Sequence, residues 1–250
     1  AGATLGRNIT DEHGQFRLPA LLGGALHSSN FIVTSTPFAT PVIAAPAVDR
    51  SAAPWREQLR AFANVHLQHT AWGVAHAQRD YELTLRLAEA ERVVVDSDAV
   101  YAAAYLHDMG AFPEFAQTDV DHGVRSGQLV AEQLIAIGFP AEKIALVRDI
   151  VEHHMYYHSP GASPEALLFR DADTLDFLGA IGIARICSIT TRHRWATDLS
   201  AAIATLRKNA MELPGTLHFA SARREANARV AVMRTFLDAI DADVGRSRAY

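Results

Sequence analysis

Apolar residues recur at helical spacing along most of this chain, and this periodicity limits the possible fold more than any other feature. One example is the series Trp55, Leu59, Phe62 and Val65, whose members fall on one face of a predicted helix. No stretch shows the sustained alternation of apolar and polar residues that marks a half-buried strand. We therefore predict an all-α fold, built as a bundle of helices.

Capping residues and helix breakers divide the chain into elements. Ser51 and Thr70 are candidate N-caps, and Pro54 suits a first helical turn. Asp96 and Ser163 are expected to open later helices. Gly138 and Pro140 mark a sharp stop and restart. Beyond a first helix from about Ser51, the expected helices span residues 70–90, 96–108, 119–137, 141–154, 163–179, 182–194, 198–212 and 217–240.

The first fifty residues differ in composition from the rest. Between Leu18 and Val48 there is no Asp, Glu, Lys or Arg, and prolines interrupt any long helix. A transmembrane helix, which needs about 20 largely apolar residues without such breaks, is not expected here. We expect residues 1–50 to form an extended, irregular arm and residues 51–250 to form the helical domain. A signal peptide is the alternative, because Arg17 precedes an apolar run that small residues follow.

Charge and cysteine content exclude several classes of function. The net charge of −5 argues against nucleic-acid binding driven by bulk charge. Cys187 is the only cysteine, so an internal disulfide and a Cys-based metal site are both excluded. We expect a small-molecule phosphate substrate and no membrane partner. A homo-oligomer is one of the assemblies that this chain could form. The expected compartment is the cytoplasm, with export as the alternative if a leader preceded residue 1.

A His-Asp pair, His107-Asp108, ends an alanine-rich apolar run. Adjacent side chains leave a helix about 100° apart, but near a helix end both can reach one point in space. A neutral imidazole beside a carboxylate is a ligand pair suited to Zn, Fe, Mn or Ni. The competing explanation is an ordinary helix end with a solvated Asp at the C-cap. The residues around the pair must decide between a metal site and such a helix end.

Further His and Asp residues surround this pair in the sequence. His76 lies upstream, and His122, His153, His154 and Asp173 follow downstream. Asp173 stands in a helix that otherwise reads as buried, and an ionised carboxylate there needs a partner or a metal. Ligands so far apart along the chain are brought together by packing of helices, not by one local loop.

The order His, His-Asp, His, His, Asp resembles the HD superfamily of metal-dependent phosphohydrolases. The resemblance extends from about Trp55 to Ala242, and the run from Asp171 to Arg185 is most similar to one branch of that superfamily. It implies an HD-domain helical bundle that binds one divalent ion, or two, of Mn, Ni, Zn or Fe. The four metal ligands that the resemblance implies are His76, His107, Asp108 and Asp173.

The sequence leaves alternatives open for the roles of His122, His153 and His154. By resemblance, His122 and a histidine near position 153 contact substrate phosphate, assist proton transfer, or bind a second metal. Helical spacing after Val147 and Ile150 puts His154 on the apolar face, whereas the resemblance points to His153. We favour His153 and keep His154 as the alternative.

The implied chemistry is hydrolysis by a metal-activated water. Asp108 or His122 would take the proton, and Arg125, one turn beyond His122, would neutralise developing phosphate charge. Arg170 and Arg185 are weaker candidates for that role. Asp171 and Asp176 are expected to act as hydrogen-bond partners or capping groups, since metal-bound His residues usually donate their other N–H to a carboxylate.

Two departures from the family pattern bear on the substrate. The stretch after the His-Asp pair offers only Glu114 as an acid, and Thr174 stands where the related branch often has Arg. We expect a phosphohydrolase that cleaves a nucleotide or a small phosphate ester, with specificity set by residues 111–118 and 156–162 and by the arm. The alternatives are a two-iron HD-type oxygenase and a non-catalytic HD binding protein.

Overall fold

The computed structural model describes residues 54–247, and in this range nine α-helices follow one another without a β-strand. This confirms the predicted all-α fold, while the predicted arm, residues 1–50, lies outside the described residues. The helices are α1 (Pro54–His66), α2 (Val74–Glu91), α3 (Ser97–Leu106), α4 (His122–Ala136), α5 (Ile144–Glu152), α6 (Pro164–Asp176), α7 (Gly179–Ser188), α8 (Leu199–Glu212) and α9 (Ala220–Ser247), with short 3-10 turns η1 (Met109–Ala111), η2 (Ala141–Lys143) and η3 (Leu213–Thr216).

Side-chain caps set the first residues of several helices. The Asp96 carboxylate accepts hydrogen bonds from the backbone N–H groups at the start of α3, and Ser163 does the same for α6, so both helices begin where predicted. Helix α2 begins at Val74 after Gly73, and the prediction that Thr70 caps it is wrong. Helix α4 begins at His122 and not at Asp119. Asp119 has a φ of +61°, in the left-handed region, and Asp121 caps the helix instead.

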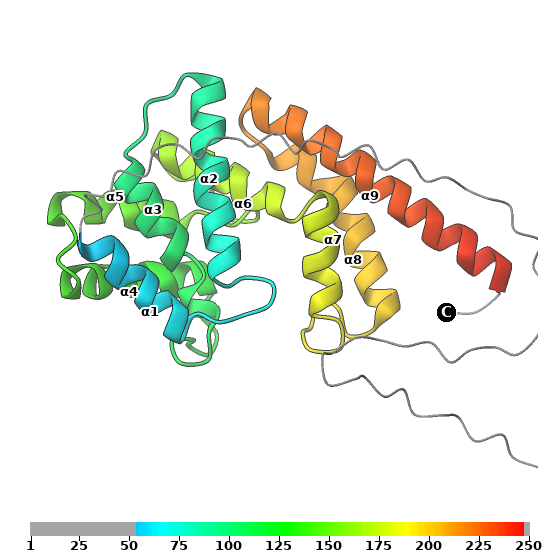
Figure 1. Cartoon of the computed structure of the whole chain (residues 1–250), viewed down its shortest axis with the longest axis horizontal. Helices are drawn as coiled ribbons and strands as arrows, with labels where there is room; N and C mark the ends of the chain where they lie inside the picture. Colours follow the sequence, from blue (N-terminus) through cyan, green and yellow to red (C-terminus); the bar gives the residue numbers. More distant parts are fainter. Residues whose placement is uncertain (1–53, 248–250) are drawn as a thin grey trace, which may run out of the picture. The chain divides into compact units, whose positions relative to one another are not determined.

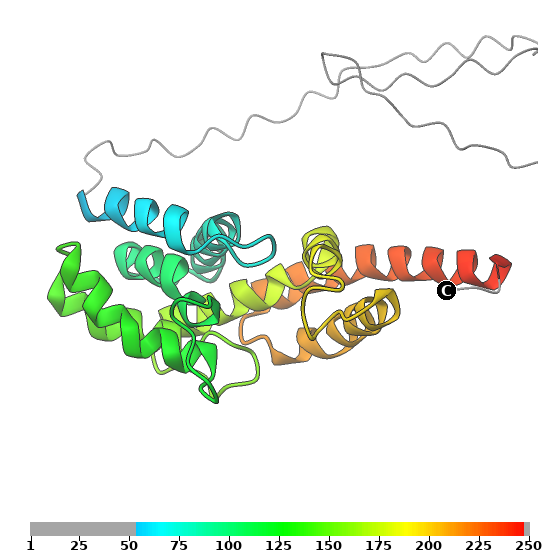
Figure 2. The same cartoon turned by 90° about the horizontal axis from the view of Figure 1, so that it is seen from below.

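Two hydrophobic cores organise these helices. The first core surrounds α3 and takes side chains from α1, α4 and α5, whereas the second takes side chains from α7, α8 and, above all, α9. Helices α2 and α6 pack against each other and contribute to both cores. Figure 1 shows α2 and α6 between the two groups of helices, and Figure 2 shows α7, α8 and α9 together from another side.

The position of α6 between two cores buries both its apolar and its charged residues. Phe169 packs into the first core and Leu175 into the second. Every residue from Leu168 to Asp176 is buried, including Asp171 and Asp173. Carboxylates in such a place are stable only when paired or bound to a cation.

None of the helices within residues 54–247 has the length and apolar character needed to cross a bilayer.

Two turns follow α6. Gly179, with a φ of +72°, allows the tight turn into α7, so Gly182 lies inside α7 and does not end α6. Residues 189–198, which we call the α7–α8 turn, then connect α7 to α8. The prediction of a helix over 182–194 is therefore wrong beyond Ser188.

Candidate metal centre

The four residues predicted as metal ligands meet where α2, α6 and the end of α3 come together. His76 lies in the first turn of α2, Asp173 lies in α6, and His107 and Asp108 directly follow α3. The Nε2 atom of His76 is 3.2 Å from His107 Nε2, 3.4 Å from Asp173 Oδ1 and 3.5 Å from Asp108 Oδ2. The structure thus brings together side chains that are far apart in the sequence.

Hydrogen bonds on the far side of each imidazole fix how these rings are turned. His107 Nδ1 lies 2.8 Å from the Ala104 carbonyl oxygen, which can only accept, so this nitrogen is the donor. His76 Nδ1 lies 2.8 Å from Asp176 Oδ2 and donates in the same way. Both rings therefore direct a free Nε2 lone pair into the cluster, the arrangement of metal-bound histidines.

Asp80 is a member of this cluster that we did not predict. It lies one helical turn after His76 on α2 and is completely buried. Its Oδ2 atom is 3.1 Å from His76 Nδ1, but neither of its oxygens makes a hydrogen bond. The His76 proton is directed to Asp176 instead, which leaves Asp80 without a donor.

The charges and unpartnered atoms of this cluster fit a divalent cation. Buried polar atoms are nearly always hydrogen-bonded, yet Asp173 Oδ2, His154 Nε2 and both Asp80 oxygens have no such partner among residues 54–247. His76, Asp80, His107 and Asp173 can offer ligand atoms that all lie within 4.8 Å of one another. Carboxylates and imidazoles together suit a transition metal ion of intermediate softness.

A second group of possible ligands adjoins the first on the other side of Asp108. His107, Asp108 and His154 form this group, and Asp108 Oδ1 is 3.4 Å from His122 Nε2 and 3.7 Å from His154 Nε2. His154 Nδ1 donates to the Val151 carbonyl oxygen, 2.7 Å away, so its Nε2 also faces the cluster. The imidazoles of His76, His107, His122 and His154 therefore all face the carboxylates of Asp108 and Asp173.

The structure brings His154, and not His153, to the centre. His153 follows α5 as a half-exposed residue, and its Nδ1 is 2.9 Å from the carbonyl oxygen of Asp149. His154 is fully buried and its ring lies 4.9 Å from that of His107. The structure therefore favours the alternative, His154, whose ring follows the end of α5 and is held by its hydrogen bond to the Val151 carbonyl oxygen.

Asp171 and Asp176 hold the surrounding structure in place. Asp176 accepts hydrogen bonds from His76, Arg79 and Arg185. Asp171 accepts from the backbone N–H groups of residues 218 and 219, just before α9 begins. Asp176 thus supports the candidate metal centre, whereas Asp171 joins α6 to the last helix.

Arg125 and Glu114 do not reach the centre. Arg125 Nε donates to the Phe115 carbonyl oxygen at 2.9 Å, which ties this guanidinium to its own loop. Glu114 is exposed and lies 2.9 Å from His66 Nδ1. Arg170 is equally occupied, since it donates to the carbonyl oxygens of Tyr156 and His158. Of the predicted arginines, Arg185 is the one on the wall of the pocket described below.

Electrostatics in the cluster favour the presence of positive charge. Burial raises the pKa of Asp80 to about 8, and burial lowers the pKa of His154 to about 3, with repulsion from His107 adding to the effect. Burial opposes ionisation of Asp108 as well, but the neighbouring His107 outweighs it and holds the Asp108 pKa well below its usual range. Burial also opposes a charge on His76, yet Asp80 and the other carboxylates raise its pKa well above normal.

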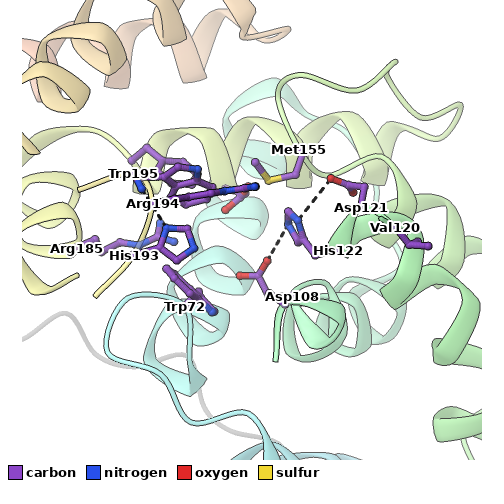
Figure 3. Close-up of a pocket in the computed structure, with 13 residues that line it drawn as sticks. Trp72, Asp108, Val120, Asp121, His122, Met155, Arg185, His193, Arg194 and Trp195 are labelled. Carbon is purple, nitrogen blue, oxygen red and sulfur yellow. Dashed lines mark hydrogen bonds and ion pairs between the residues drawn. The ribbon is translucent and has the colours of Figure 1, made fainter. Parts of the chain in front are cut away.

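A pocket of about 220 Å³ opens beside the cluster. Asp108, Asp173 and His122 form part of its wall, so the candidate metal centre faces this space. On the opposite side lie aromatic side chains from the α7–α8 turn and from the segment before α2 (Figure 3). A substrate in the pocket would therefore contact the cluster on one side and aromatic rings on the other.

Sequence comparison relates this region to a known family. Residues 73–178, less than half of the chain, match the HD domain family. All the residues of the cluster, from His76 to Asp176, lie inside the matched range. No curated protein matches the chain in sequence.

Solved structures share the fold of this chain. A Lactobacillus plantarum protein is 24% identical with a TM-score of 0.56 and covers 77% of this chain and 97% of its own. A predicted HD superfamily hydrolase from an uncultured Thermotogales bacterium is 23% identical, with a TM-score of 0.52 and coverage of 76% and 90%. Bacillus subtilis YpgQ in complex with ADP is 23% identical, with a TM-score of 0.57 and coverage of 76% and 97%. These likenesses show the fold alone. The particular branch of the HD superfamily that residues 171–185 resemble stays a prediction.

Proposed function

We propose that this protein is a metal-dependent phosphohydrolase that cleaves a nucleotide or a small phosphate ester. The observation that carries the proposal is the convergence of four imidazole Nε2 atoms on Asp108 and Asp173 beside an open pocket. The HD domain match supports the same activity, because the HD superfamily contains metal-dependent phosphohydrolases.

The proposed metal ligands are His76, His107, Asp108 and Asp173, and the proposed ion is Mn, Ni, Zn or Fe. When bound, such an ion lowers the pKa of a water ligand and polarises a phosphoryl oxygen. The protein itself fixes the ligand directions, through the hydrogen bonds that His76 and His107 make on their far sides.

His122 and Asp108 are the proposed proton-handling pair. Their atoms His122 Nε2 and Asp108 Oδ1 are 3.4 Å apart on the pocket wall, and Asp121 Oδ2 is 3.7 Å from the other ring nitrogen of His122. A proton at Nε2 can therefore pass between the pocket and Asp108 while Asp121 stabilises the charged ring. General acid–base groups need this kind of direct access to the reacting atoms.

Arg185 is the proposed contact for phosphate charge inside the pocket. Its NH1 group is 2.9 Å from Asp176, which positions the guanidinium next to His76. Arg125 is not part of this proposal, because it does not line the pocket and its side chain is bound to the Phe115 carbonyl group. The ADP complex of YpgQ, a protein with the same fold, supports keeping nucleotides among the candidate substrates.

The decisive experiment measures metal content per chain and hydrolysis together. Wild-type protein, the Asp173→Asn variant and a control Asp171→Asn variant would be purified without added metal and then reconstituted. We expect the wild type and the control to bind metal and to release phosphate from some member of a phosphate-ester panel, and Asp173→Asn to lose both properties. No bound metal in the reconstituted wild type would overturn the proposal.

A two-iron oxygenase is the second candidate function. The second ligand group around Asp108, with His122 and His154, is the observation that favours it, because these residues could hold another ion. Two irons per chain, an iron-dependent absorption band and oxygen consumption would identify this class. One metal per chain with phosphate release would exclude it.

A further inference from the structure

The α7–α8 turn has a well-defined backbone. Thr191 adopts a φ of +69°, and its N–H group donates to the Ala196 carbonyl oxygen across the turn. The carbonyl group of Trp195 accepts a hydrogen bond from the Thr205 hydroxyl of α8 at 2.7 Å. Ala196 is fully buried. These contacts hold the three consecutive side chains at positions 193–195 against the pocket.

Aromatic side chains from three separate elements meet at this side of the pocket. The ring of Trp195 lies 4.7 Å from His193, 6.1 Å from Trp72 and 6.4 Å from Phe177. The ring of His69 stacks on that of Trp72, with the ring centroids 3.5 Å apart, and so holds Trp72 in place. Trp72, His193 and Trp195 are only partly buried although they line the pocket, so they are not simply core residues.

Arg194 brings an uncommitted positive charge to the same place. It is exposed, and within residues 54–247 it makes no hydrogen bond or ion pair. Its side chain extends from the turn into the pocket in the direction of Met155 (Figure 3). Arg185, the other arginine on the pocket wall, is held by Asp176, so Arg194 adds a second and unbound guanidinium to that phosphate contact, and Arg192 does not line the pocket. A free guanidinium beside a candidate metal centre is well suited to bind a phosphate oxygen.

The size of the pocket limits what can occupy it. Its volume of about 220 Å³ lies below the range of roughly 300–1,000 Å³ that is typical of sites for drug-sized ligands. A phosphate group and one flat ring are therefore the largest parts of a ligand that we expect to be enclosed. Any further part of the substrate would remain in solvent.

We propose that the α7–α8 turn is the substrate-recognition element of this protein, and that it selects a phosphate ester bearing a flat ring. Trp195 and Trp72 contact the ring, and Arg194 binds an anionic oxygen of the phosphate. This inference rests on the proposed function, since it places the phosphate group at the candidate metal centre.

The test measures binding of two phosphonates that differ only in the ring. Phenylphosphonate and methylphosphonate carry a C–P bond in place of the ester bond, so binding to the Mn-loaded protein can be followed by calorimetry without phosphate-ester hydrolysis. The variants are Trp195→Leu, Trp195→Phe and Arg194→Gln, with Arg192→Gln as a matched control on the same turn. Thermal unfolding of each variant would verify that it is folded.

The expected result separates ring contact from charge. Wild type binds phenylphosphonate about three- to tenfold more tightly than methylphosphonate, as one aromatic contact provides. Trp195→Leu removes that preference and Trp195→Phe keeps it, whereas Arg194→Gln weakens the binding of both compounds by about tenfold. Arg192→Gln binds both compounds as the wild type does.

Unchanged preference in folded Trp195→Leu protein, or unchanged affinity in Arg194→Gln, would overturn this inference. Failure of the wild type to bind either phosphonate would overturn it as well. Neither result depends on turnover, so a failed ester screen is a failure of the proposed function alone. Conversely, hydrolysis of ring-free esters with no effect of these variants would leave the proposed function standing without the recognition role of the turn.

Discussion

The imidazole of His76 and the carboxylate of Asp176 join α2 to α6 directly behind the candidate metal centre. The two atoms involved, Nδ1 and Oδ2, are 2.8 Å apart, and the same carboxylate accepts hydrogen bonds from Arg79 and Arg185. These donors outweigh the effect of burial and lower the pKa of Asp176, which keeps it ionised. A negative charge at this position makes the opposite nitrogen of His76 a better metal ligand.

Replacing Asp176 by Asn should weaken metal binding by about 10- to 100-fold, as loss of such outer hydrogen-bond partners usually does. Chelator competition would measure the affinity. Asp171→Asn is the matched control, because Asp171 contacts the start of α9 and not the cluster. It should leave metal affinity unchanged while lowering the free energy of unfolding by about 1–3 kcal/mol. Equal metal affinities in the two variants would contradict this assignment.

Substitution of the two adjacent histidines by Gln should have unequal effects. His154→Gln removes a buried Nε2 atom that faces Asp108, so metal affinity or activity should fall by about 10- to 100-fold. His153→Gln alters a half-exposed side chain that contacts Asp149 and should change either property less than about twofold. Parallel metal titrations and initial rates would test this, and a larger effect at His153 would show that the assignment is reversed.

A methyl group at Gly182 should destabilise the protein. An added Cβ there would overlap the backbone carbonyl group of Phe177, which cannot move without disturbing the α6–α7 turn. We expect Gly182→Ala to lower the free energy of unfolding by about 1–3 kcal/mol in denaturant titrations. Gly215→Ala is the control, because its Cβ would meet open space, and it should be neutral or stabilising by up to about 1 kcal/mol. Similar stabilities of the two variants would contradict the packing argument.

The ion pairs of Asp98 should make stability depend on pH. Burial raises the pKa of Asp98, but hydrogen bonds from Arg56 and Lys143 outweigh this and hold the pKa below its usual value. The resulting stability is fully present above the pKa of an unfolded Asp, about 3.9, and is lost as pH falls through the folded pKa. The stability difference between wild type and Asp98→Asn should therefore shrink on going from pH 6 to pH 3. A constant difference across that range would count against the ion pairs.

Helical periodicity and capping residues predicted the fold well because they act locally. Asp96 and Ser163 cap α3 and α6 as expected. The start of α4 was less predictable, since the left-handed conformation of Asp119 depends on the loop around it. Val65 was expected on the buried face of the first helix, yet it is exposed near the end of α1, where little packs against it.

The candidate site shows where sequence reasoning is insufficient. Helical spacing indicated His154 as an inward residue, and this purely physical signal agreed with the structure better than the family resemblance did. Asp80 could have been found by the same rule, because it lies one turn from His76 on the inner face of α2. The recruitment of Trp72 and Trp195 to one pocket depends on how the segment before α2 meets the α7–α8 turn, and no local pattern encodes that.

Arg170 gives the loop after α5 a particular freedom. Its guanidinium group holds that loop through the main-chain carbonyl groups of Tyr156 and His158, and these are present whatever side chains stand there. The main chain of the loop therefore keeps its course next to Met155 and the pocket independently of those side chains, although Tyr156 also packs against the second core and His158 contacts Asp121. Related proteins with this arginine could vary the loop side chains, and with them the ligand preference, on an unchanged main chain, which makes the loop a suitable segment for engineering.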